Sequence, residues 1–167
     1  MVDERIKTLQ ISALSRINFC FKELKNTPPL MWENNVLEKD SIEISSQNYM
    51  NLSSDEKVSF KETLYKYLDR ESTTEARTML IINYLSALLI EGRNNKISIH
   101  KNFGNKMQEI RNFETENEDT LHNLKSARDK FYAHIDLDWQ KYAKSITFDE
   151  FERCIKFLND LFNYRVF

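Results

Sequence analysis

Met79-Leu-Ile-Ile-Asn-Tyr-Leu-Ser-Ala-Leu-Leu-Ile90 is the longest apolar stretch of the chain, and it decides the predicted fold class. The stretch has about half the length of a membrane-spanning helix, which needs roughly 20 apolar residues, and it contains Asn83. We therefore predict a helix that is buried in the protein core. The capping-box spacing of Ser72 and Glu75 predicts where this helix begins, and Gly92 predicts its end.

The sequence on either side of this stretch is also helical in character. The chain has only two Gly and two Pro among its 167 residues, so few residues would interrupt a helix. A first helix is predicted from about Asp3 to Leu24, followed after Pro28 and Pro29 by a short helix over about 30–36. The inward face of the first helix is predicted from three- and four-residue spacing to contain Ile6, Leu9, Ala13, Leu14, Ile17, Cys20, Phe21 and Leu24.

A long Ser/Asn-rich loop is predicted at about 39–54, and the capping-box pair Ser53 and Glu56 then opens a helix that extends to about Leu68. Weaker periodicity predicts a helix at about 97–113, and a further helix is predicted at about 117–135. Thr147 and Glu150 cap a final helix with a strong apolar stripe formed by Phe148, Phe151, Ile155, Leu158 and Phe162. These elements predict a single all-α domain over residues 1–167, with four to six mostly antiparallel helices.

The net charge of −2 and the pI of about 6.0 provide no overall positive field for nucleic acid. Contact with RNA would therefore require a local basic patch or one created by dimerisation. Cys20 and Cys154 lack the spacing of a zinc site, which favours reduced thiols, and no pattern in the chain predicts a cofactor. The charged N-terminus lacks the apolar run of a secretion signal. We predict a cytoplasmic protein without a membrane segment.

Arg128-Asp129-Lys130-Phe131-Tyr132-Ala133-His134 is the segment that carries most information on function. On a helical wheel, Arg128 and His134 lie on either side of an apolar stripe formed by Leu121, Leu124, Ala127, Phe131 and Ile135. An arginine beside such a stripe needs a partner, because a buried charge is costly unless it is paired. A guanidinium that holds a phosphate beside an imidazole that moves a proton could cleave RNA without a metal.

In this hypothesis Arg128 holds the phosphate and stabilises the charge of the transition state, while His134 exchanges a proton with the ribose 2′-hydroxyl or the leaving 5′-oxygen. Asp129 orients the imidazole or anchors Arg128. Lys125 and Lys130 contribute to a phosphate track, together with Lys141 and Lys144, and Tyr132 lines the groove or stacks on a base.

A structural interpretation explains the same residues. Arg128 would pair with Asp129, Asp136 or another acidic residue, His134 would cap a helix end, and the lysines would form a solvated helix face. The spacing alone is not specific, because Arg93 and His100 also match it across a predicted helix break. Asp119 and His122 form half of a possible metal site, but a second Glu-x-x-His unit is missing, so no metal site is predicted.

The segment Ala127-Arg-Asp-Lys-Phe-Tyr-Ala-His134-Ile-Asp136 resembles the terminal-helix signature of HEPN domains, especially the subgroup linked to phage abortive infection. The resemblance implies a HEPN-like helical bundle, a homodimer in which two Arg/His pairs meet across the interface, and metal-independent cleavage of RNA. The essential roles then fall on Arg128 and His134, with Asp129 assisting.

In one respect the chain departs from this family pattern. Relatives that are toxins paired with a nucleotidyltransferase often have a tyrosine two residues after the histidine, where this chain has Asp136. Two hypotheses follow: an endoribonuclease of toxin or phage-defence type, acting on RNA and restrained by an antitoxin protein, or a non-catalytic RNA-binding or protein-interaction subunit of a defence or toxin–antitoxin complex.

Overall fold

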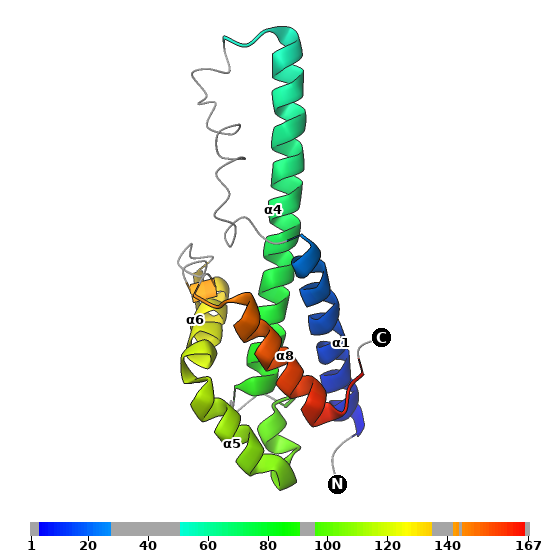
Figure 1. Cartoon of the computed structure of the whole chain (residues 1–167), viewed down its shortest axis with the longest axis vertical. Helices are drawn as coiled ribbons and strands as arrows, with labels where there is room; N and C mark the ends of the chain where they lie inside the picture. Colours follow the sequence, from blue (N-terminus) through cyan, green and yellow to red (C-terminus); the bar gives the residue numbers. More distant parts are fainter. Residues whose placement is uncertain (1–3, 28–50, 91–95, 135–141, 144, 166–167) are drawn as a thin grey trace.

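The computed structural model describes residues 4–27, 51–90, 96–134, 142–143 and 145–165, and every regular element in these ranges is helical (Figure 1). The all-α prediction is therefore confirmed. The short helix predicted at 30–36 and most of the loop predicted at 39–54 lie outside the described residues. The elements, in chain order, are α1 (Glu4–Asn26), α4 (Ser54–Leu89), the 3₁₀ helices η2 (Ile99–Lys101) and η3 (Gly104–Lys106), α5 (Met107–Glu116), α6 (Glu118–His134) and α8 (Phe148–Phe162).

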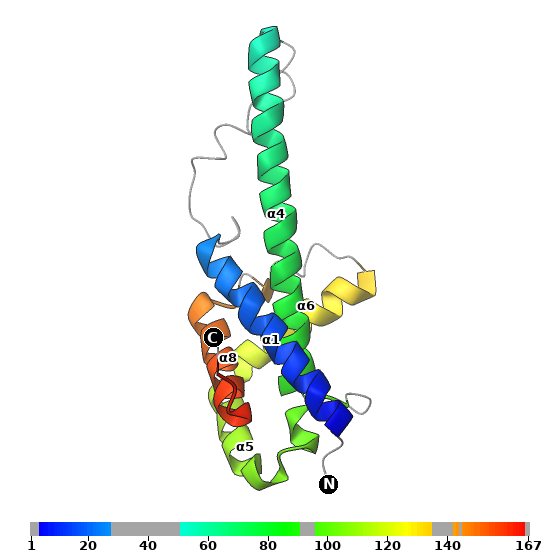
Figure 2. The ribbon, with the colours of Figure 1, turned by 90° about the vertical axis from the view of Figure 1, so that its right-hand side faces the viewer.

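Helix α1 packs antiparallel against the C-terminal half of α4 (Figures 1 and 2). Two polar contacts fix the alignment of these helices. Arg16 Nη1 donates to the Tyr84 hydroxyl at 2.9 Å, and Glu23 forms an ion pair with Arg77 at 3.6 Å. The residue number rises on one helix as it falls on the other, as antiparallel packing requires.

The core lies where α1, α6 and α8 surround the C-terminal half of α4. The stretch that begins at Met79 supplies its centre, as predicted. In the described part of the chain, no helix combines the length and apolar character needed to span a bilayer. The largest fully buried side chains are Leu14, Ile17, Leu24, Ile81, Ile82, Leu85, Leu88, Leu89, Ile99, Ile110, Leu124 and Phe151.

The predicted inward face of α1 is correct except at its beginning. Leu9 is 57% exposed, Ile6 is half-buried, and the neighbouring Gln10 is only 1% exposed. The Gln10 side chain donates from Nε2 to the main-chain carbonyl of Ile97 at 2.9 Å. A buried amide is tolerated when it forms such a bond. The distant Ile97 carbonyl therefore allows Gln10, and not Leu9, to be the buried residue.

The prediction of two helices over residues 53–90 is wrong, because α4 is one helix of 36 residues, about 54 Å long. Ser53 does form the predicted capping box with Glu56. The second predicted box at Ser72 does not start a helix, since the chain is already helical there. Thr74 and Thr78 bond through their hydroxyls to the carbonyls four residues earlier, so these β-branched residues fit within the helix.

The prediction of an α-helix at 97–113 is also wrong for the first half of this range. Residues 99–106 form η2 and η3, and the α-helix begins only at Met107. Gly104 lies within the predicted helix, and glycine disfavours the interior of an α-helix. The ring of Phe103 packs edge-on against Phe162 at a centroid distance of 4.9 Å, which holds this segment against α8.

Helix α8 begins as predicted. The Thr147 hydroxyl accepts from the Glu150 main-chain N–H at 3.3 Å, and the Thr147 N–H donates to Glu150 Oε2 at 2.7 Å. Thr120 of α6 also donates to Glu150 Oε1 at 2.8 Å, so this carboxylate joins two helices. The buried apolar stripe of α8 consists of Phe151, Cys154, Ile155, Leu158 and Leu161. The predicted stripe residues Phe148 and Phe162 are half-buried at the edges of this stripe.

Stability should depend on the charge of Glu150. Burial acts to raise the pKa of this carboxyl, but hydrogen bonds from Thr147 and Thr120 and the nearby Arg153 outweigh it and lower the pKa. A lowered folded-state pKa stabilises the protein above the unfolded value of about 4.3, and this contribution is lost as the pH falls through the folded-state pKa. We expect Glu150→Gln to lower the free energy of unfolding at pH 7, with the difference from wild type shrinking below about pH 4.

Urea unfolding of both proteins from pH 7 to pH 3 measures this difference. Glu75→Gln, a change within α4 at a half-buried glutamate, is the matched control and should show a smaller difference at pH 7. A Glu150→Gln difference that does not vary with pH would contradict the proposed role of the charge.

Candidate functional site

Helix α6 carries the candidate site and presents the predicted apolar stripe to the core. Leu124 and Ala127 are fully buried, and Leu121 and Phe131 are half-buried against the core. The buried Ser86 hydroxyl of α4 donates to the Leu124 carbonyl at 3.3 Å, which links the two helices one turn before Arg128. Ile135, the last residue of the predicted stripe, lies outside the described residues.

Arg128 lies at the edge of this stripe and is anchored by its neighbour. Its side chain is 28% exposed, whereas that of Asp129 is 54% exposed. Arg128 donates from Nε at 2.9 Å and from Nη2 at 2.7 Å to the same oxygen, Oδ1 of Asp129. Of the two roles considered for Asp129, anchoring Arg128 is the one seen, and the ion pair expected from the structural interpretation is present as well.

This ion pair leaves part of the guanidinium available. An arginine has five N–H donors, and two of its nitrogens are used on one oxygen. Nη1 has no protein acceptor among the described residues. The site could therefore keep Arg128 in place through Asp129 while the remaining N–H groups hold an anion.

The remaining predicted site residues are only partly described. Lys125 is exposed one turn before the ion pair, and Lys130 is half-buried. His134 is the last residue of α6, but its side chain and that of Tyr132 lie outside the described residues. Asp136, Lys141, Lys144 and Arg93 lie outside them too. The structure thus brings together Arg128 and Asp129, with Lys125 beside them on the same helix.

His100 has two side-chain partners that the sequence pattern did not indicate. His100 Nδ1 lies 2.9 Å from the Ser98 hydroxyl, and Nε2 lies 2.6 Å from Glu114 Oε1. A serine, a histidine and a carboxylate joined by hydrogen bonds have the composition of a nucleophilic triad. Ser98 is fully buried, however, so a substrate would not reach its hydroxyl. The network instead joins η2 to α5.

Asp119 and His122, considered as half of a metal site, are not grouped with further ligands among the described residues. His122 is exposed on α6, with Nε2 3.5 Å from the Ser126 hydroxyl. In the ranges that the structure describes, no three His, Cys, Asp or Glu side chains are grouped as metal ligands. Cys20 and Cys154 are buried free thiols, and burial raises the pKa of Cys154 to about 12, which keeps it protonated and unreactive.

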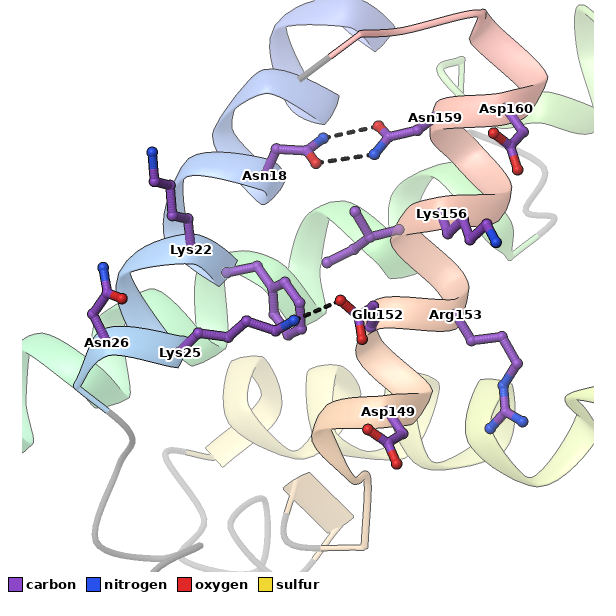
Figure 3. A pocket seen from close by; sticks show the side chains of 12 residues that line it. Asn18, Lys22, Lys25, Asn26, Asp149, Glu152, Arg153, Lys156, Asn159 and Asp160 are labelled. Carbon is purple, nitrogen blue, oxygen red and sulfur yellow. Dashed lines mark hydrogen bonds and ion pairs between the residues drawn. The ribbon is translucent and has the colours of Figure 1, made fainter. Parts of the chain in front are cut away.

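A groove of about 830 Å³ lies between α1 and α8, and no residue of α6 lines it. Figure 3 shows that two polar bridges cross it. Asn18 and Asn159 exchange amide hydrogen bonds at 2.9 and 3.0 Å, and Lys25 pairs with Glu152. Lys22 points away from the opposite helix (Figure 3). The bridges hold α8 against α1, and we assign no ligand to this groove.

Comparison of the chain with models of protein families, with curated proteins and with solved structures found no match.

Proposed function

We propose that this protein is a metal-independent endoribonuclease of toxin or phage-defence type. The observation that carries the proposal is the anchored, half-buried Arg128 on α6, whose guanidinium keeps unpaired donors among the described residues. Its segment resembles the HEPN signature, and Lys125 adds a positive charge one turn away. These features suit the binding of a phosphodiester and the stabilisation of its transition state.

The spacing of Arg128 and His134 supports an active site that is shared between two subunits. Residues six apart on a helix differ by about 9 Å along the axis and by about 120° around it. They are therefore not neighbours in the way that residues three or four apart are. Two copies of α6 facing each other would place each arginine near a partner histidine, so we include a homodimer in the proposal.

The proposed chemistry assigns one role to each residue. Arg128 binds the scissile phosphate, and His134 removes the proton of the ribose 2′-hydroxyl, so that this oxygen attacks phosphorus. The bond from phosphorus to the 5′-oxygen breaks, and the imidazolium returns the proton to that leaving oxygen. Asp129 acts as a positioning residue through Arg128. Lys130 and Tyr132 complete the substrate contacts, and an antitoxin protein would restrain the activity.

The test is cleavage of structured RNA in EDTA by purified protein. We expect His134→Ala to reduce the rate by about 10²- to 10⁴-fold, which is the usual contribution of general acid–base catalysis. His122→Ala, at an exposed position on the same helix, is the matched control and should retain wild-type activity. Equal rates for wild type and His134→Ala would rule out the assignment.

A second function is favoured by the ion pair itself. Asp129 partly neutralises Arg128, and the net charge of the chain is −2. A non-catalytic RNA-binding or protein-interaction subunit would need no free guanidinium. Salt-dependent RNA binding without cleavage, weakened by Lys125→Ala, would select this function.

A further inference from the structure

Helix α1 has a surface that no other described helix covers. Arg16 and Glu23 contact α4 on one flank of α1. Asn18 and Lys25 contact α8 on the other flank. The sector between these flanks points away from the bundle, and Figure 2 shows α1 in front of α4. Phe19 lies in this sector with 61% of its surface exposed, so an aromatic ring is open to solvent there.

Phe19 has a cation about one turn away on each side. Arg16 and Lys22 are three residues before and after it, so each lies about 60° from the ring around the helix. Both are exposed, and Lys22 points away from α8 (Figure 3). Among the described residues no carboxylate pairs with Lys22, and the neighbouring Glu23 is already paired with Arg77. We call Arg16, Phe19 and Lys22 the α1 face, which is cationic around one exposed ring.

Arg16 is held in place and still keeps donors for a ligand. Its Nη1 donates to the Tyr84 hydroxyl at 2.9 Å, and its Cζ lies 5.9 Å from the centre of the Tyr84 ring. Its Nε and Nη2 bond to no acceptor among the described residues. A guanidinium that is positioned in advance loses little freedom when it binds a phosphate, which favours binding.

We propose that the α1 face binds single-stranded RNA, with one base stacked on Phe19 and the phosphates on either side of that base held by Arg16 and Lys22. This inference rests on the proposed function in taking RNA as the ligand. Proteins bind single strands of many sequences through aromatic rings beside cations, because every base has a π face that can stack. A duplex keeps its bases stacked inside, so it would not use the ring.

Equilibrium binding of a labelled, unstructured RNA tests the proposal. The His134→Ala variant serves as the parent, so that the RNA stays intact during the measurement. Phe19→Ala should weaken binding by about 5- to 150-fold, because stacking contributes about 1–3 kcal/mol per base and 1.4 kcal/mol is tenfold. Phe19→Tyr keeps the ring and should bind as the parent does. Tyr65→Ala, which removes a 71% exposed ring from α4, is the matched control and should also bind like the parent.

The salt dependence of binding tests the phosphate contacts. Each phosphate contact with a single strand contributes about 0.7 to the slope of log K against log salt concentration. Lys22→Ala should therefore reduce this slope by about 0.7. Lys7→Ala removes the same charge from another flank of α1 and is the matched control, so it should reduce the slope less. A duplex of the same sequence should bind equally well to the parent and to Phe19→Ala.

Two results would overturn the proposal. Phe19→Ala that binds the single strand as tightly as the parent would show that no base stacks on this ring, and it would leave the α1 face to a protein partner. Equal losses from Phe19→Ala and Tyr65→Ala would show that the effect is not local to α1.

The α1 face and ribonuclease activity can fail separately. Wild type that binds RNA through Phe19 but cuts none supports the α1 face and opposes the proposed nuclease. If the protein does cut RNA, Phe19→Ala should raise KM with little change in kcat. Cleavage whose KM and kcat are both unaffected by Phe19→Ala opposes only the α1 face. A chain that binds no RNA opposes both.

Discussion

Replacing Arg128 by alanine is expected to slow RNA cleavage in EDTA by about 10²- to 10³-fold, the usual effect of removing one group that stabilises transition-state charge. The fold should survive the change. Arg128 is 28% exposed and its ion pair is with the exposed Asp129, and such pairs contribute about 0–1 kcal/mol to stability. Single-turnover cleavage rates, with circular dichroism to verify folding, measure the two effects separately.

Three variants sharpen this test. Arg128→Lys keeps the charge but loses the fork of N–H donors, so it should recover only part of the rate. Asp129→Asn keeps an oxygen acceptor for Arg128 without its charge, and it should affect the rate less than Arg128→Ala. Lys125→Ala should weaken RNA binding more than it slows the bound complex. Arg128→Ala activity equal to that of wild type would contradict the proposed site.

Replacing Phe151 by alanine is expected to cause the largest loss of stability, about 3–5 kcal/mol. The Phe151 side chain is fully buried in α8, and it belongs to the core that joins this helix to the rest of the bundle. Its removal loses apolar burial and leaves a cavity that the surrounding helices fill only in part. The free energy of unfolding of a typical domain is about 5–15 kcal/mol, so this substitution would remove a large part of it.

Urea unfolding of wild type and Phe151→Ala measures this change at pH 7. Phe19→Ala is the matched control, since the same substitution is made on a side chain that is 61% exposed. It should change the free energy of unfolding by no more than about 0.5 kcal/mol. Comparable losses for both variants would mean that α8 does not pack on the core as described.

Local patterns predicted much of the secondary structure. The three- and four-residue spacing in α1 and α8 identified most of their buried faces, and both capping boxes at Ser53 and Thr147 are present. These signals succeed because they depend on neighbours within one turn. The stripe around Arg128 was predicted in the same way, which placed this residue correctly at the boundary between core and solvent.

Local patterns failed where a choice depended on distant residues. Ser72 and Glu75 have the spacing of a helix start, but nothing between Ser54 and Leu89 stops the preceding helix. Gln10 replaces Leu9 in the interior because the carbonyl of Ile97, 87 residues away, accepts its hydrogen bond. The contact between His100 and Glu114 likewise required η2 and α5 to meet.

The sequence by itself determined that the chain is helical, which faces of α1 and α8 are apolar and where an arginine meets the apolar stripe of α6. These properties follow from spacing, because an α-helix repeats every 3.6 residues regardless of its surroundings. Only the tertiary structure decided that Gln10 rather than Leu9 is buried and that half of α4 extends beyond the bundle. Both depend on which helices pack together and how far each contact extends, and no local spacing encodes that.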